Sequence, residues 1–338
     1  MTPVIFGLEG LSLTRTERDF FKETRPFGFI LFGRNVADRQ QLLRLTGELR
    51  ALTGNDQLPV LIDQEGGRVA RMQAPQWATY PPAATFEALY RRNREWGLEA
   101  CTLNYEALAL DLAEVGLSVA CAPVLDVPVM NAHDVIGDRA FSQDSSSVAA
   151  LGRACLAGLS AGGVEGVIKH IPGHGRSVVD SHLELPRVVA DQTELERDLG
   201  PFKALNDASM AMTAHVIYEA WDSQHCATLS EDVIGRVIRR TVGFDGLLMT
   251  DDLDMKALSG DIGDLAAQSQ AAGCDVVLNC WGKMNDMESI VKKMRSPTPQ
   301  TLTRMRRVND RLAKASSSVT ISERQRALTA RRDALLAS

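Results

Sequence analysis

The residues best suited to chemistry lie between positions 169 and 182 of the 338-residue chain. This segment contains three of the six histidines, in the run Lys169-His170-Ile171-Pro172-Gly173-His174-Gly175 and the later triplet Asp180-Ser181-His182. Its Gly and Pro residues exclude a continuous helix. Titratable side chains on a glycine-rich turn after an apolar run (164–168) are typical of a catalytic loop at the end of a strand. We therefore predict an enzyme.

Two kinds of chemistry fit this segment. A metal site would use His170, His174 and His182 with a carboxylate, but the intervening Pro and Gly remove the helical spacing that presents two imidazoles together. We therefore expect no metal and no cofactor. Acid–base catalysis needs a histidine oriented by a carboxylate. Asp180 and His182 flank one serine and would point the same way in an extended segment, so this pair is the favoured candidate.

Unusual polar residues also follow other apolar runs, and in a barrel such strand ends converge on one face, where active sites are built. The residues are Asp63, Glu65, Asp126, Lys169, His170, His215, Asp251 and Asp252. Carboxylates, imidazoles and a lysine together would suit a ligand rich in hydroxyl groups. For Glu65, Asp126 and Asp252, helix capping or loop bonding is an equally good interpretation.

Three other residues have more modest expected roles. We expect His174 to brace its loop and His215 to line the floor of the site or bond to a neighbouring strand. Trp281 would form part of the pocket wall or lie buried under the barrel rim.

Eight short apolar runs are spaced along the chain, and each is followed by a polar or glycine-containing segment and a helical pattern. They are 4–10, 29–32, 60–62, 119–124, 164–168, 210–214, 247–249 and 276–278. Nearly continuous apolar runs are expected of strands buried on both faces. Helix starts are predicted by capping patterns at Thr14 with Glu17, at Asp38 with Gln41, and at Ser230. The favoured fold is a single α/β domain, a (β/α)8 TIM-type barrel over 1–338, and a doubly wound sheet is the alternative.

Composition narrows the class of protein. Hydrophobic residues make up 45% and charged residues 24% of the chain, as in soluble globular proteins. The net charge of -6 argues against nucleic acid or an anionic membrane as a partner. The six cysteines are scattered and fit reduced core thiols. Without a recognisable signal peptide or an apolar run of about 20 residues, we expect a cytoplasmic monomer with no membrane contact. The tail from Ser317 is expected to form a helix that packs on the barrel.

Several motifs in this order resemble family 3 glycoside hydrolases, in particular the bacterial β-N-acetylglucosaminidase (NagZ-type) branch. They are the histidine segment 169–182, the segment 62–69 with Arg71, the loop Gly137-Asp138-Arg139-Ala140-Phe141, and the segment 243–246 leading to Thr250-Asp251-Asp252-Leu253 and Met255. Ile171, Thr250 and Ala140 depart from the usual residues of the family. They leave the proposed catalytic groups intact but put fine substrate preference in doubt.

The resemblance implies a retaining mechanism with a covalent glycosyl-enzyme intermediate. Asp251 would be the nucleophile and His182 the general acid/base, oriented by Asp180. The terminal sugar would be bound by Asp63, Arg71, Arg139, Lys169 and His170.

The expected substrate is a small sugar fragment, GlcNAc linked to anhydroMurNAc, from which the enzyme would remove terminal GlcNAc during peptidoglycan recycling. The chain has no room for the second domain that supplies a carboxylic acid in other branches of the family, which favours the β-N-acetylglucosaminidase branch. Two alternatives stay open. A phosphorylase is one, since a histidine repels phosphate less than a carboxylate does. A catalytically inactive sugar-binding barrel is the other.

Overall fold

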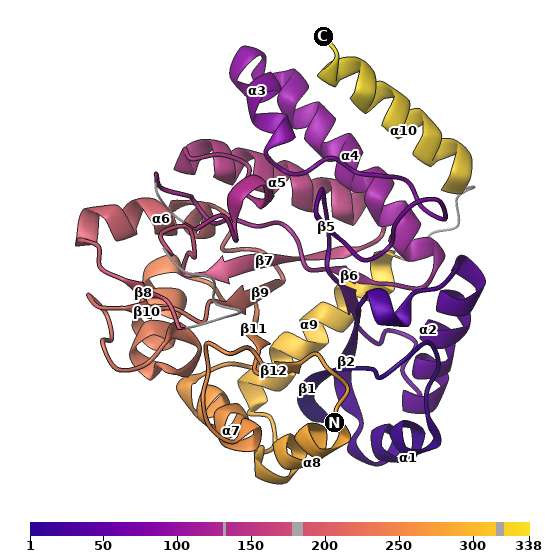
Figure 1. The fold of residues 1–338 in the computed structure, drawn as a ribbon, viewed down its shortest axis with the longest axis vertical. Helices are drawn as coiled ribbons and strands as arrows, with labels where there is room; N and C mark the ends of the chain where they lie inside the picture. Colours follow the sequence, from indigo (N-terminus) through magenta and orange to yellow (C-terminus); the bar gives the residue numbers. More distant parts are fainter. Residues whose placement is uncertain (131–132, 178–184, 316–320) are drawn as a thin grey trace.

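Eight parallel strands form a closed barrel at the centre of the molecule (Figure 1), in a computed structural model that describes residues 1–130, 133–177, 185–315 and 321–338. In order around the barrel they are β1 (Thr2–Gly7), β12 (Val276–Asn279), β11 (Leu247–Asp252), β9 (Met210–Thr213), β7 (Glu165–Ile171), β6 (Val119–Ala120), β3 (Val60–Ile62) and β2 (Pro26–Leu31). Each predicted apolar run overlaps one of these strands. The barrel prediction is confirmed, and the doubly wound alternative is wrong because the sheet closes on itself.

Helices follow the barrel strands and surround them (Figure 1). The main outer helices are α1 (Arg15–Thr24), α2 (Arg39–Thr53), α4 (Arg94–Glu114), α5 (Ser145–Ala161), α6 (Gln192–Ala204), the π-helix η4 (Val233–Val242), α7 (Ile262–Ala272) and α8 (Met284–Lys293). The additional helices are α3 (Thr85–Arg92), α9 (Pro299–Ala315), α10 (Ile321–Leu336) and the short turns η1 (Gly33–Asn35), η2 (Gly137–Arg139) and η3 (Ala227–Leu229).

Two small sheets lie outside the barrel. An antiparallel pair is formed by β4 (Gln64–Gly66) and β5 (Val69–Ala70), and a parallel pair by β8 (Arg187–Val188) and β10 (Ile217–Tyr218). The β4–β5 pair directly follows β3, so it extends the chain beyond the carboxyl end of that barrel strand.

Apolar side chains fill the barrel interior. Ile30 pairs with Leu61, which pairs with Val119 on the next strand, and all three belong to one buried cluster. Met305 and Val308 of α9 belong to the same buried cluster, which also contains the first residues of several barrel strands. Arg304 of α9 also bonds to Asp275, just before β12, at 3.1 Å. Helix α9 therefore covers the amino-terminal end of the barrel and leaves the carboxyl end for the site.

Predicted helix starts are confirmed with one difference in detail. Thr14 and Glu17 form a full capping box at α1. Asp38 accepts the amide of Gln41 at 2.8 Å, but the Gln41 side chain bonds the amide of Ala37 rather than that of Asp38. Ser230 accepts the amide of Val233 at 3.1 Å.

The carboxyl-terminal tail forms the predicted helix. Figure 1 shows α10 alongside α4, and Arg332 donates a hydrogen bond of 2.8 Å to the Asn104 side chain on that helix. The tail is therefore packed on the outer layer of the barrel.

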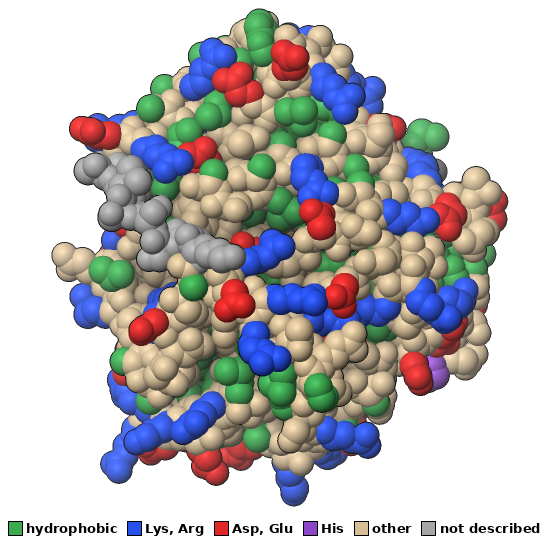
Figure 2. Space-filling view, turned by 180° about the vertical axis from the view of Figure 1, so that it is seen from behind, with side chains coloured by type: hydrophobic (Ala, Val, Ile, Leu, Met, Phe, Trp, Pro, Cys, Tyr) green, Lys and Arg blue, Asp and Glu red, His purple; other side chains and the backbone are tan. Residues whose placement is uncertain are grey.

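The surface and the cysteines are those of an ordinary globular protein. All six cysteines are free and buried, as predicted. On the face in Figure 2, Lys and Arg side chains lie interspersed with Asp and Glu side chains. None of the helices in the described ranges has the length and apolar character needed to cross a bilayer.

Candidate active site

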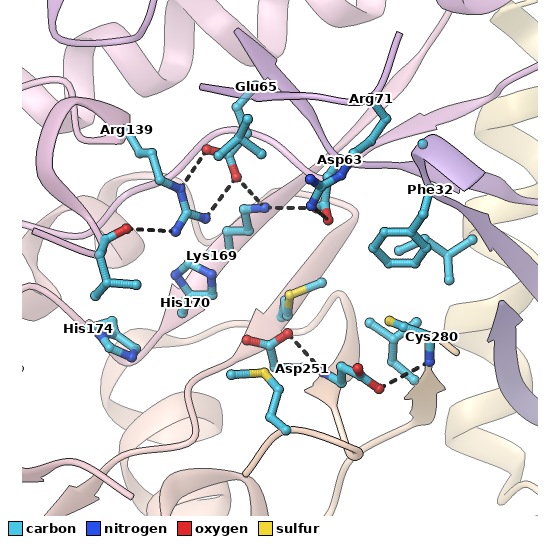
Figure 3. A pocket seen from close by; sticks show the side chains of 18 of the residues that line it. Phe32, Asp63, Glu65, Arg71, Arg139, Lys169, His170, His174, Asp251 and Cys280 are labelled. Atoms are coloured by element: carbon cyan, nitrogen blue, oxygen red, sulfur yellow. Dashed lines mark hydrogen bonds and ion pairs between the residues drawn. The ribbon is translucent and has the colours of Figure 1, made fainter. Parts of the chain in front are cut away.

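Six of the eight polar residues predicted from the strand ends, all except Asp126 and His215, line one pocket of about 390 Å³ at the carboxyl end of the barrel (Figure 3). They come from segments far apart in the sequence, because parallel strands bring their carboxyl ends to one face. The polar lining consists of Arg34, Asp63, Glu65, Arg71, Arg139, Lys169, His170, His174, Asp251 and Asp252, together with Cys280 and Trp281. All five predicted sugar-binding residues and the predicted nucleophile are therefore brought together.

A chain of ion pairs crosses one wall of the pocket (Figure 3). Glu65 receives two hydrogen bonds of 2.9 Å from Arg139 and lies 2.6 Å from Lys169 Nζ. Lys169 Nζ also lies 3.3 Å from Asp63 Oδ1, and Arg71 Nη2 donates to Asp63 Oδ2 at 3.1 Å. The bidentate arginine pair and the shared lysine fix all five side chains in one arrangement.

These groups keep their charges although they are buried. Burial alone would raise the pKa of Glu65, but the positive charges of Lys169 and Arg139 lower it to about 2. The pKa of Asp63 is likewise held well below its ordinary value by Lys169 and Arg71, against the effect of burial. Burial would lower the pKa of Lys169, yet Glu65 and Asp63 raise it. The wall thus presents fixed anionic acceptors and cationic donors, which suits sugar hydroxyl groups.

Asp126 positions the two described histidines of the 169–175 run. Its Oδ2 lies 2.7 Å from His170 Nδ1, and its Oδ1 accepts the backbone amides of His170 at 3.2 Å and His174 at 2.7 Å. Burial opposes ionisation of Asp126, but the neighbouring His170 lowers its pKa to about 2. An ionised Asp126 requires the Nδ1 proton on His170, so Nε2 is the ring atom left for the pocket.

His174 does more than brace its loop. Its backbone is held by Asp126, as expected of a bracing residue, but its ring also lines the pocket and packs edge-on to His170 with 5.7 Å between centroids. Burial, with the adjacent His170, lowers the pKa of His174 to about 4. The ring is therefore neutral at neutral pH and contributes shape rather than charge.

The adjacent aspartates Asp251 and Asp252 have different surroundings. Asp252 is buried, and its Oδ1 accepts the amides of Cys280 at 3.1 Å and Asp254 at 3.3 Å. Asp251 lies across the pocket from the ion-pair wall, and its Oδ1 accepts the amide of Asp252 at 2.8 Å (Figure 3). Both aspartates line the pocket, but Asp252 also braces the loops after β11 and β12, whereas Asp251 lies across from the ion-pair wall.

The surroundings of the two aspartates shift their pKa values in opposite directions. Burial raises the pKa of Asp252 to about 6. Burial also opposes ionisation of Asp251, but the imidazoles of His170 and His215 lower its pKa below the ordinary value. Asp251 is thus an ionised carboxylate facing the pocket, as a nucleophile requires.

His215 supports the site from the neighbouring strand. Its Nε2 donates to the carbonyl oxygen of Asp252 at 3.0 Å, and its Nδ1 lies 2.7 Å from Thr228 Oγ1. The prediction that His215 bonds to a neighbouring strand is confirmed.

The predicted acid/base pair, Asp180 and His182, lies outside the described residues, so its position relative to Asp251 stays a prediction. Within the described ranges, no group of three or more His, Cys, Asp or Glu side chains is arranged to hold a metal ion. His170, one member of the metal set considered from the sequence, bonds to Asp126 through Nδ1.

Sequence reasoning did not assign site roles to several residues. Glu65 and Asp126 were noted at strand ends, but their functions as an ion-pair centre and a histidine brace depend on partners more than forty positions away. The apolar lining from Phe32, Val135, Ile136 and Met255 was not predicted as such, since single apolar residues in loops carry no periodic signal. Trp281, which the sequence left open, is part of the pocket wall and is 54% exposed.

Comparison with known proteins agrees with this geometry. Residues 8–311 match the family model described as the glycosyl hydrolase family 3 N terminal domain. The chain belongs to glycosyl hydrolase family 3. A protein of Thioalkalivibrio sulfidiphilus named beta-hexosaminidase is 36% identical over 329 residues, which cover 95% of this chain and 92% of the relative.

Solved structures place this family 3 chain in the NagZ-type branch. Native NagZ from Neisseria gonorrhoeae superposes with a TM-score of 0.86 at 30% identity, covering 99% of this chain and 97% of NagZ. The same enzyme in complex with N-trifluoroacetyl-D-glucosamine gives a TM-score of 0.86 at 29% identity, with 98% of each chain covered. The predictions of the family, the barrel fold and a glycoside hydrolase of the β-hexosaminidase type are confirmed.

Proposed function

We propose that this family 3 member is a retaining, exo-acting β-N-acetylglucosaminidase that removes terminal GlcNAc through a covalent glycosyl-Asp251 intermediate. The observation that carries the proposal is the position of the Asp251 carboxylate, which faces a wall of sugar-binding charges across a pocket of about 390 Å³. That volume suits one terminal sugar unit.

The pocket wall supplies the contacts for that sugar. Asp63 and the Nε2 atom of His170 accept hydrogen bonds from hydroxyl groups, while Arg71 and Lys169 donate to them. Arg139, held by Glu65, directs its remaining donors toward the hydroxyl and N-acyl oxygens. An N-acyl glucosamine is also the ligand in the complex of Neisseria gonorrhoeae NagZ, which supports this sugar class. Because the ion-pair wall blocks one side of the pocket, the substrate enters by its non-reducing end.

The reaction follows two displacements. In the first, Asp251 attacks the anomeric carbon, the glycosidic bond breaks, and His182 in its imidazolium form protonates the departing oxygen. In the second, neutral His182 takes a proton from water as the water oxygen displaces Asp251 from the same carbon. Asp180 orients His182 and favours its charged form. The spacing of the two residues around Ser181 and the family motif support this pair.

The substrates we propose are muropeptide fragments that carry GlcNAc on anhydroMurNAc, cleaved in the cytoplasm during cell-wall recycling. One catalytic barrel domain, acting as a monomer without a cofactor, suffices for this reaction. The pocket supports the monomer proposal because the ion pairs of its wall all form within one chain.

Covalent trapping tests the nucleophile and the sugar class together. A fluorinated N-acetylglucosaminide with a good leaving group slows breakdown of the intermediate, so the labelled peptide can be identified by mass spectrometry. We expect the label on Asp251 in the native protein and in an Asp252→Asn variant, and no label in Asp251→Asn. Label on another residue of the native protein would overturn the assignment.

A leaving-group comparison tests His182. His182→Ala should reduce hydrolysis of a disaccharide far more than that of an aryl glycoside, and azide should restore aryl turnover. An aryl activity that falls equally and does not respond to azide would contradict an acid/base role. The same assay run with phosphate should still release free GlcNAc, whereas a sugar 1-phosphate would identify a phosphorylase.

A further inference from the structure

One loop supplies three side chains of the pocket wall. Val135, Ile136 and Arg139 line the pocket, and all three belong to the loop 134–139. This loop consists of turns and the short η2, with no strand or long helix to support it. Side chains on such a loop keep fixed distances to a bound sugar only if other contacts hold the backbone in place.

Arg68 supplies such contacts. Its Nε lies 3.1 Å from Asp138 Oδ1, and its Nη1 lies 3.2 Å from Asp134 Oδ2. Its Nη2 donates to the carbonyl oxygens of Val135 at 3.3 Å and Ile136 at 3.2 Å, and also to that of Asp134. The planar fork of donors on one guanidinium thus binds the loop at four residues.

Gly137 lets the guanidinium lie directly against the loop. Its φ of +44° is in the left-handed region that favours glycine. A Cβ atom at this position would lie 2.9 Å from Arg68 Nη2 and 2.3 Å from Asp134 Oδ1. The conformation of the loop and its contact with Arg68 therefore depend on each other.

The β4–β5 hairpin binds this loop through two of its residues. Arg68 lies in the turn of the hairpin, and Glu65, three residues earlier, receives two bonds of 2.9 Å from Arg139 (Figure 3). The turn itself is fixed, because the amide of Gly67 donates to the carbonyl oxygen of Tyr80 at 2.8 Å. Arg68 is not among the described residues that line the pocket, so its influence on a sugar is transmitted by the loop.

We propose that Arg68 is a positioning residue for sugar binding, which holds the loop 134–139 so that its side chains keep their places in the pocket wall. This role rests on the proposed function, because the loop completes the sugar pocket. Glu65 fixes only Arg139, whereas Arg68 fixes residues 134–138.

Loss of Arg68 would affect binding more than chemistry. Two loop carboxylates, those of Asp134 and Asp138, would lose the cation between them, and the carbonyl oxygens of the loop would lose a shared donor. The apolar part of the wall would then move. Asp251 lies on β11, across the pocket from the ion-pair wall, and makes no contact that depends on this loop. We therefore expect a raised KM with kcat nearly unchanged.

The test measures KM and kcat for an aryl N-acetylglucosaminide, and inhibition by free GlcNAc, in the full-length protein. Arg68→Ala should raise KM and the inhibition constant about five- to tenfold and lower kcat less than about threefold. Arg68→Lys should not restore KM, because one ammonium group cannot reach all the acceptors of the loop. The Arg68 side chain is 42% exposed, so its removal leaves a gap open to solvent. Added guanidinium ion, at concentrations that do not denature the native protein, should therefore return the KM of Arg68→Ala toward the native value.

Arg153 on α5 gives the matched control. Its side chain is similarly exposed, at 48%, and bonds to the Asp207 carboxylate and a backbone carbonyl oxygen. Arg153→Ala should keep the native KM, with or without guanidinium.

The outcomes separate positioning from a general role in folding. A residue needed only for stability would lower the amount of active protein without changing KM, and guanidinium would not restore binding. An Arg68→Ala variant with the native KM, or with a raised KM that guanidinium leaves unchanged, would overturn the proposal. If Arg68→Ala does not fold, Asp138→Asn, which weakens one contact, should raise KM about threefold, and an unchanged KM there would equally overturn it. Failure of the native protein to bind GlcNAc or to cleave the glycoside would instead contradict the proposed function.

Discussion

Lys169 Nζ lies 2.6 Å from Glu65 Oε1, and these side chains are only 3% and 5% exposed at the wall of the pocket. Two buried charges of this kind stabilise each other, and removal of one leaves the other buried without a partner. Glu65 has the same relationship with Arg139, so a single carboxylate holds two cations in position to bind a sugar. The rigidity of the sugar site thus depends on a residue that we do not expect to touch the reacting atoms.

Replacing Glu65 with Gln should therefore cost both stability and substrate affinity. We expect a loss of about 3 kcal/mol in the free energy of unfolding, measured by urea denaturation, together with a raised KM for an aryl N-acetylglucosaminide. The matched control is Glu48→Gln, which breaks a partly exposed pair with Arg18 and should cost less than about 1 kcal/mol. Equal losses in the two variants would contradict the importance of the buried network.

The adjacent aspartates should differ sharply in catalysis. Asp251→Asn should lower kcat by at least about a thousandfold, as expected when a nucleophile is removed. Asp252→Asn retains the Oδ1 acceptor that bonds to the amides of Cys280 and Asp254, so its kcat should fall by less than about tenfold. Both kcat values are measured in a steady-state assay with an aryl N-acetylglucosaminide. A larger loss of kcat in Asp252→Asn than in Asp251→Asn would make Asp252 the nucleophile instead.

Asp252 should also make stability depend on pH. Burial raises its pKa in the folded protein from the ordinary value of 3.8 to about 6. Between these values the unfolded chain binds fewer protons than the folded one, so stability falls as the pH rises from about 4 to about 6. The Asp252→Asn variant lacks this titration. The difference in free energy of unfolding between the variant and the native protein should therefore shift in favour of the variant by about 1–3 kcal/mol from pH 4 to pH 8.

A second aspartate gives a control of opposite sign for that measurement. Hydrogen bonds from Arg307 and Arg304 lower the pKa of Asp245, so Asp245→Asn should lose stability relative to the native protein as the pH rises through the acidic range. Urea denaturation at several pH values measures both variants. Parallel pH profiles for the two variants would contradict the assignment of the raised pKa to Asp252.

The barrel could be predicted from the sequence because each buried strand is a nearly unbroken apolar run, such as Val60–Ile62. The polar residues that follow these runs could be placed on one face by the geometry of parallel strands. Their individual roles could not be assigned from this pattern. Both aspartates line the pocket, and which of them is held by loop amides depends on how the chain turns after β11. The amides of Cys280 and Asp254 that bond to Asp252 belong to loops without a sequence signal. The family resemblance, rather than the pattern of residues, ranked Asp251 first.

The segment that carries His174 passes very close to the chain after β6. A Cβ atom added to Gly175 would lie 2.1 Å from the carbonyl oxygen and 2.4 Å from the carbonyl carbon of Val127. These are backbone atoms that cannot rotate away, and Val127 directly follows the Asp126 that bonds to both histidines. A larger residue at position 175 must therefore separate the two segments and move His170 and His174 away from their brace.

Gly175→Ala should consequently lower the free energy of unfolding by about 1–3 kcal/mol, the usual cost of overpacking, and should reduce kcat/KM as well. The control is Gly47→Ala on the exposed face of α2, where an added Cβ meets no atom within 4 Å. That change should stabilise the protein by up to about 1 kcal/mol, because Ala favours a helix more than Gly does, with kcat/KM unchanged. A Gly175→Ala variant as stable and active as Gly47→Ala would show that the two segments separate without cost, and that the Asp126 brace does not position the histidines.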